Sequence, residues 1–111
     1  MGKNRQADML QGTLELLILR MLQSGEQNGW DIMQRIRAVT SEVLSVTPGA
    51  LYPALHRLED RGLIAAAWGA SHNNRRARFY RLTPAGRRQL AVERTTWARF
   101  SGAVEALLRN A

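Results

Sequence analysis

The segment TPGALYPALHRLEDRGLI, residues 47–64, carries the start and stop signals of one helix, the central helix of this chain. Thr47 can cap the first turn, and Pro48 suits the first helical position, where its missing N–H would have no partner. The leucines at 51, 55 and 58 fall on one face and predict a buried stripe. Gly62 tolerates the left-handed conformation that commonly follows a helix.

The other faces of this helix carry side chains that can contact a partner outside the protein. They are Tyr52, His56, Arg57 and Arg61. Pro53 argues against the helix, because an internal proline removes one backbone hydrogen bond and crowds the carbonyl of the preceding turn. From the residues alone, the conflict between the capping signals and Pro53 stays open.

Length and composition indicate one domain with its own core. The chain has 111 residues, of which 45% are hydrophobic, and it contains no cysteine. Disulfides and thiolate metal sites are therefore excluded. The longest apolar region, residues 14–22, includes Glu15 and Arg20 and is too short to span a bilayer. Because no signal peptide is recognisable either, we expect a cytoplasmic protein with no membrane partner.

The net charge of +7 is concentrated in one part of the chain. Residues 1–56 carry five basic and five acidic side chains, a sum of zero. Residues 57–88 carry eight arginines against Glu59 and Asp60, a sum of +6, and residues 89–111 add +1. This local excess favours a polyanion as partner, since the planar fork of arginine suits phosphates and guanine edges. A basic surface that only keeps the protein soluble is the alternative.

Two further helices are expected before the central stretch. Apolar residues recur with a helical period between residues 8 and 23. Asn28 can cap the second helix, and Asp31 would lie near its positive end. Its buried stripe would consist of Ile32, Ile36 and Val39. With a linker at residues 40–46, these helices and the central one describe a helix-turn-helix.

The pattern changes after Gly62 to that of a β-hairpin. Residues 63–68 are small and apolar, and residues 76–82 alternate, with Tyr80 and Leu82 on one face. The segment between them is rich in turn formers and arginine. A helix-turn-helix followed by a basic hairpin has the order of a winged helix.

Thr83-Pro84 repeats the capping signal and opens a last helix that ends near Arg109. It carries a long apolar stripe, which left in water favours association with a second copy of the chain. The stripe consists of Leu90, Trp97, Phe100, Val104, Leu107 and Leu108. We therefore expect a mainly α fold with a small β-hairpin: a winged helix-turn-helix at residues 8–83 and a dimerisation helix at residues 84–110.

Several segments of this chain resemble the PadR family of bacterial transcriptional regulators, of the short kind with one C-terminal helix. The most specific is PGALYPALHRLE, residues 48–59, and the others are GTLELLIL at 12–19, GLI at 62–64 and YRLTPAG at 80–86. The resemblance implies a dimeric winged-helix repressor whose C-terminal helix contacts the N-terminal helix of the partner. It also implies that Pro53 is tolerated within the recognition helix.

Two segments depart from the pattern of the family. Asn28-Gly29-Trp30 stands where the family usually has His-Gly-Tyr, so we expect the fold to be kept and a phosphate contact to be altered. Ala50 stands where family members often have serine, which removes one hydroxyl contact to the DNA backbone.

The residues expected to bind double-stranded DNA lie on the central helix, on the hairpin and at the start of the second helix. They are Trp30, Thr47, Pro48, Gly49, Ala50, Tyr52, His56, Arg57, Arg75, Arg76 and Arg78. Arg57 is expected to read guanine, and the hairpin arginines to add affinity through phosphates or the minor groove. The alternative is that Tyr52 packs partly in the core, that Arg57 and Arg61 pair with acidic neighbours, and that the hairpin tip is only solvated.

The resemblance also implies a hydrophobic cavity at the dimer interface where a tryptophan stacks on flat aromatic effectors. Its lining would be Leu10, Leu14, Trp97 and Phe100. A Trp97 that only anchors the dimer is the alternative.

We expect no metal site, no cofactor and no enzymatic activity. His72 has no second ligand nearby, and no catalytic grouping of side chains is recognisable. The sequence thus predicts a DNA-binding transcriptional regulator, a dimeric repressor of an inverted repeat released by a planar aromatic effector. A winged-helix module that binds another protein, without sequence-specific DNA binding, is the alternative.

Overall fold

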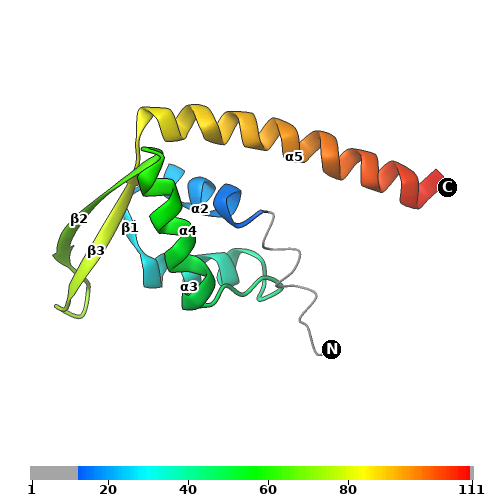
Figure 1. Ribbon diagram of the computed structural model, residues 1–111. Helices are drawn as coiled ribbons and strands as arrows, with labels where there is room; N and C mark the ends of the chain where they lie inside the picture. The colour runs from blue at the N-terminus through cyan, green and yellow to red at the C-terminus, as the bar shows by residue number, and fades with distance from the viewer. Residues whose placement is uncertain (1–12, 111) are drawn as a thin grey trace.

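Three helices of the computed structural model, which describes residues 13–110, surround a core of aliphatic side chains (Figure 1). They are α2 (Leu14–Gln23), α3 (Gly29–Val39) and α4 (Pro48–Asp60). Each buries one stripe, as its apolar period predicts. The most deeply buried of these side chains are Ile18, Leu19 and Leu22 of α2, Ile32 and Ile36 of α3, and Leu51, Leu55 and Leu58 of α4.

The predicted capping signals are confirmed. The side chain of Asn28 accepts a hydrogen bond from the backbone N–H of Asp31 at 2.8 Å, which opens α3. Thr47 accepts one from the N–H of Ala50 at 3.3 Å, which opens α4. Gly62 has a φ of +73° and follows the end of α4. The helix also contains Pro53, whose side chain is exposed, so its ring disturbs no packed neighbour.

The burial of α3 and the start of α2 differ from the expectation. Val39 was expected in the buried stripe of α3, but its side chain is exposed. It follows Ile32 and Ile36 on the same face of α3, but it lies in the last turn of the helix, where the burial of that face ends. The expected helical residues 8–12 lie outside the described part of the chain, in which α2 begins at Leu14.

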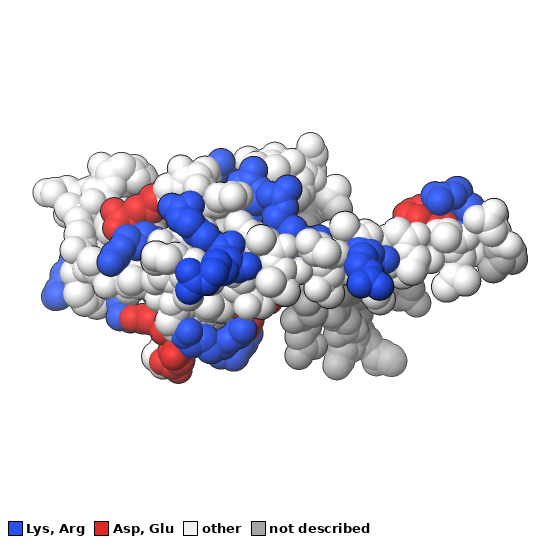
Figure 2. All heavy atoms as spheres, turned by 90° about the horizontal axis from the view of Figure 1, so that it is seen from above, with Lys and Arg blue, Asp and Glu red and all other residues white. Residues whose placement is uncertain are grey.

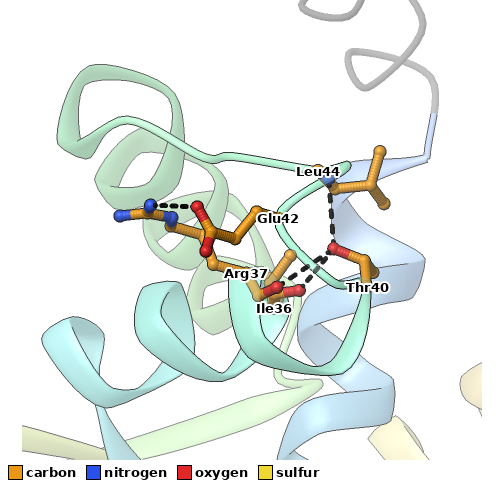
Figure 3. A network of polar contacts seen from close by, with 5 residues as sticks. All are labelled: Ile36, Arg37, Thr40, Glu42 and Leu44. Atoms are coloured by element: carbon orange, nitrogen blue, oxygen red, sulfur yellow. Dashed lines mark hydrogen bonds and ion pairs between the residues drawn. The ribbon is translucent and has the colours of Figure 1, made fainter.

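A turn with a defined hydrogen-bond pattern joins α3 to α4 (Figure 3). The hydroxyl of Thr40 donates to the carbonyl oxygen of Ile36 at 2.8 Å and accepts from the N–H of Leu44 at 3.1 Å. Glu42 has a φ of +66° and pairs with Arg37 at 3.1 Å. The chain therefore reverses direction within a few residues, which sets the angle between the two helices of the helix-turn-helix.

The strands form a three-stranded antiparallel sheet in the order β1-β3-β2. The hairpin consists of β2 (Ile64–Ala70) and β3 (Arg76–Leu82), so the turn is shorter than the sequence suggested. Sequence analysis missed β1 (Gln27–Asn28), which is too short to show a period and pairs with Tyr80 and Phe79 of β3. Ile64 pairs with Leu82, and this end of the hairpin closes the core.

The last helix, α5 (Pro84–Asn110), passes over α2 and continues beyond the rest of the chain (Figure 1). The hydroxyl of Thr83 donates to the carbonyl oxygen of Gly62 at 2.7 Å and accepts from the N–H of Gly86 at 3.0 Å. Leu90 is buried in the core of its own chain. None of the helices between residues 13 and 110 combines the length and apolarity that crossing a bilayer requires.

We predict opposite effects for alanine at the two glycines of α5. A Cβ on Gly86 would overlap the carbonyl oxygen of Leu63, whereas a Cβ on Gly102 would meet no atom within 4 Å. Gly86→Ala should lower the free energy of unfolding by roughly 1–3 kcal/mol. Gly102→Ala should leave it unchanged or raise it by up to about 1 kcal/mol. Urea denaturation at one fixed protein concentration measures both, and equal values for the two variants would contradict this packing.

Candidate nucleic-acid interface

The N-terminal half of α4 presents a continuous exposed surface. Thr47, Pro48, Gly49 and Ala50 are all exposed at its first turn. The amides of such a turn and the positive end of the helix dipole are suited to bind a phosphate. Tyr52 and His56 follow on exposed faces of the helix. The predicted residues of this helix are thus on the surface and lie together.

Arg57 lies on the flank of α4 that faces α2. Its Nε is 3.0 Å from one carboxylate oxygen of Glu15, and Arg61 reaches the other oxygen at 3.0 Å. We call these three residues the Glu15 fork. Arg57 forms an ion pair, as the alternative interpretation expected. Its partner lies on another helix and is not a sequence neighbour. A guanine contact by Arg57 stays a prediction, and Glu15 would compete for the same guanidinium.

The three hairpin arginines have different surroundings. Arg78 reaches back to α4 and pairs with Glu59 at 2.8 Å, with both side chains half-buried. The guanidinium of Arg76 lies over the ring of Trp68, 4.3 Å from its centroid. Arg75 ends the exposed turn, where its backbone pairs with Ser71. Within the described residues, neither Arg75 nor Arg76 forms an ion pair, so both positive charges of the hairpin tip are available to a partner.

A hollow of about 620 Å³ separates the hairpin from the beginning of α3 and from α4. Aromatic side chains from three elements line it: Trp30 of α3, Tyr52 of α4, and Trp68 and Tyr80 of the hairpin. Arg75, Arg76 and Arg78 line it as well, and none of its described lining residues is acidic. We refer to it below as the wing hollow.

Tyr52 and Tyr80 line the inner side of the wing hollow. A Cβ on Gly29 would lie 2.6 Å from the hydroxyl oxygen of Tyr52, so glycine is what lets that ring pack against the start of α3. Burial raises the pKa of the Tyr80 hydroxyl above its ordinary value, although Arg78 acts in the opposite direction. Tyr80 is therefore neutral at physiological pH and adds no negative charge to the hollow.

Sequence analysis missed Trp68 and the acidic partners of the arginines. The alternation of side chains along a strand could have indicated Trp68. In a strand that begins at Ile64, positions 64, 66 and 68 share one face. No comparable signal exists for Glu15, which lies 42 residues before Arg57.

Basic charge is also present away from the helix-turn-helix. Arg87 and Arg88 are exposed in the first turns of α5. Figure 2, seen from above α5, shows Lys and Arg side chains gathered over its first half. The +6 of residues 57–88 is thus divided among ion pairs, the hairpin tip, the exposed Arg81 of β3 and the first turns of α5, and does not form a single patch.

The family model of the Transcriptional regulator PadR-like family matches residues 18–92, more than half of the chain. The chain belongs to this family. It is therefore a transcriptional regulator, and the role that this implies is DNA binding. The predicted family and the winged-helix fold class are confirmed, and the family consists of regulators and not of enzymes.

Solved structures of other regulators are similar over nearly the whole chain. A transcriptional regulator from Clostridium thermocellum is 28% identical, with a TM-score of 0.81 over 88% of this chain and 95% of that chain. A PadR-like regulator from Bacillus cereus is 28% identical, with a TM-score of 0.79 over 94% and 99%. The transcriptional regulator Rv3488 of Mycobacterium tuberculosis is 49% identical over 49 residues, 44% of this chain and 45% of that protein.

The stripe of α5 in this PadR-like regulator is exposed beyond Leu90. Trp97, Phe100, Val104, Leu107 and Leu108 are between 37% and 75% exposed. The rings of Trp97 and Phe100 contact each other with centroids 6.1 Å apart. Of the other residues expected at an effector site, Leu14 is buried in the core, and Leu10 lies outside the described residues. In the described part of the chain no group of three or more His, Asp or Glu side chains is placed to hold a metal ion.

Proposed function

We propose that this PadR-like regulator is a dimeric repressor in the bacterial cytoplasm that binds an inverted repeat in double-stranded DNA. The observation that carries the proposal is the exposed N-terminal half of α4 beside the two unpaired arginines of the hairpin tip. One α4 would enter the major groove of each half-site, about one helical turn of DNA apart.

The contacts divide between positioning and base reading. The first turn of α4, Thr47 to Ala50, would bind a backbone phosphate through its amides. Tyr52 and His56 would contact base edges, and Arg57 would do so where it exchanges Glu15 for guanine. Trp30, Arg75 and Arg76 would contact the backbone and add affinity without base preference. Arg78, held by Glu59, would act mainly by fixing the hairpin.

The exposed stripe of α5 supports the homodimer. Trp97, Phe100 and Val104 lie on one face of a helix that extends beyond its own core. Covering such a stripe with an identical chain removes a large apolar surface from water without requiring another protein. The distance between the two α4 helices, and hence the half-site spacing, would follow from this contact.

We also propose that a planar aromatic effector binds beside Trp97 in the dimer and releases DNA. The tilted contact of Trp97 with Phe100 and their exposure support it, because both rings present a free edge or face to an adjacent aromatic molecule. Leu14 is buried in this chain, so it would join the site only if α2 moved. An interface in which Trp97 serves only as an anchor is the alternative.

A module that binds another protein is the second candidate function. Three of the eight arginines of residues 57–88 are held in ion pairs, and others lie on α5, which lowers the attraction of the α4 surface for a polyanion. DNA affinity that is weak, unaffected by salt and indifferent to sequence would support this candidate.

Selection of duplexes from a random pool tests the repressor proposal. At moderate salt the protein should enrich an inverted repeat, and its affinity should fall steeply as salt rises, because bound arginines release counterions. We expect roughly a 1,000-fold preference over random duplex DNA. Failure to enrich any sequence would refute sequence-specific binding.

The same selection on two variants decides the role of Arg57. If Arg57 reads guanine, Arg57→Gln relaxes the preference at one position of each half-site, while Glu15→Gln keeps it. If Arg57 serves only the Glu15 fork, both variants keep the wild-type preference. Each would then lose less than about 1 kcal/mol of stability, as exposed ion pairs usually do.

A glutamate in the stripe of α5 tests the dimer. Val104→Glu should make the protein monomeric at concentrations where the wild type is dimeric, weakening association at least about 100-fold, because a charge would be buried without a partner. Val92→Glu is the matched control. Val92 is also exposed, but twelve residues away it lies about 120° around the helix. Analytical ultracentrifugation measures both, and identical behaviour of the two variants would exclude the stripe as the interface.

Tryptophan fluorescence tests the effector. In a variant with Trp30→Phe and Trp68→Phe, Trp97 is the one tryptophan left of three. Planar aromatic molecules should quench its emission at the concentrations that release DNA from the wild type. A broad panel of such molecules that neither quenches Trp97 nor releases DNA would rule the effector role out.

A further inference from the structure

The wing hollow exposes two tryptophans that the core does not need. The side chains of Trp30 and Trp68 are 58% and 60% exposed and line the same hollow from α3 and from β2. Covering an exposed aromatic side chain with a partner is favourable, and such side chains are enriched at binding surfaces. Their position on opposite elements indicates a partner that enters between the hairpin and the helices.

The charge of the hollow selects an anion. Its described lining contains three arginines, no acidic residue, and a neutral Tyr80 hydroxyl. Arg78 is tied to Glu59, which leaves Arg75 and Arg76 for the partner. An anion with an apolar surface beside its charge matches this combination of arginine and indole.

The geometry gives Trp68 a defined role toward Arg76. On β3, Arg76 lies two residues from Arg78, the cross-strand partner of Trp68, so Trp68 and Arg76 are diagonal neighbours on one face of the sheet. The indole supports the guanidinium at 4.3 Å. An arginine at the edge of an exposed turn would otherwise sample many rotamers, and holding it in one reduces the entropy lost on binding.

We propose that the wing hollow holds one sugar–phosphate strand of bound DNA, and that Trp68 is the positioning residue that holds Arg76 for a phosphate of that strand. This rests on the proposed DNA binding. Tyr52 belongs both to α4 and to the hollow, so a duplex that contacts the exposed face of α4 passes the hollow. The indole of Trp30 packs against deoxyribose, and Arg76, supported by Trp68, contacts the phosphate.

Affinity and its salt dependence, measured on the duplex that the wild type selects, test this role. Arg76→Gln should weaken binding roughly 5- to 20-fold and reduce the salt slope by about 0.9, the value for one lost phosphate contact. Trp68→Ala should weaken binding by a similar factor. The affinity of the double variant should lie within about twofold of that of the single variant that binds less tightly. Both substitutions disrupt the same Trp68–Arg76 pair, so their effects should not add. Trp68→Phe, which keeps an aromatic face, should recover most of the loss.

Two controls separate this role from a loss of fold or of general charge. Arg88→Gln removes an exposed arginine of α5, outside the hollow, and should change affinity less than Arg76→Gln. Thermal unfolding should show Trp68→Ala folded, since the indole is mostly exposed.

Full affinity in Trp68→Ala would overturn the positioning role. So would a double variant that loses the product of the two single losses. Equal loss in Trp68→Ala and Trp68→Phe would do the same, because it would show no aromatic support of Arg76. A wild-type protein that binds no duplex would instead refute the proposed function, so the two failures are distinguishable.

Discussion

The close approach of α5 to the backbone at Leu63 is the constraint on which the rest of the arrangement depends. Gly86 leaves no room for a side chain there, and Thr83 joins the start of α5 to the turn after α4. Four chain segments therefore meet at one point: the end of α4, the start of β2, the end of β3 and the start of α5. Because they meet, the direction of α5 and the position of the hairpin beside α4 are set together, and a dimer formed through α5 would fix both binding surfaces.

Ion pairs then determine which arginines are available. Glu15 holds Arg57 and Arg61 on the α2 side of α4, and Glu59 holds Arg78 on the hairpin side. These carboxylates form ion pairs on both sides of α4 and neutralise the arginine charges near its C-terminal end. Arg75 and Arg76 are left at the hairpin tip, and the guanidinium of Arg76 lies over the ring of Trp68. The location of two glutamates thus separates the ion-paired arginines of α4 and the hairpin from those at the tip.

Much of the fold could be predicted from the sequence, because the residues that determine it are close together in the chain. The cap at Asn28, the helix from Pro48, the glycine at 62 and the hairpin all follow from residues within a few positions of one another. β1 was missed because two residues carry no period, and its strand character comes from pairing with β3. Val39 was misplaced because an apolar period specifies a face of a helix and not whether another element covers that face.

The helices, the hairpin, the family and the surface of α4 follow from the order of the residues, because periodicity, capping and the motif around Pro53 depend on short-range chemistry. The tertiary structure was needed to show which arginines are ion-paired, since Glu15 and Arg57 are 42 residues apart and no local rule joins them. It alone brought Trp30, Tyr52 and Trp68 from three elements into one hollow. Contacts of this kind arise from the packing of distant segments, and the spacing of residues along the chain does not encode them in a readable form.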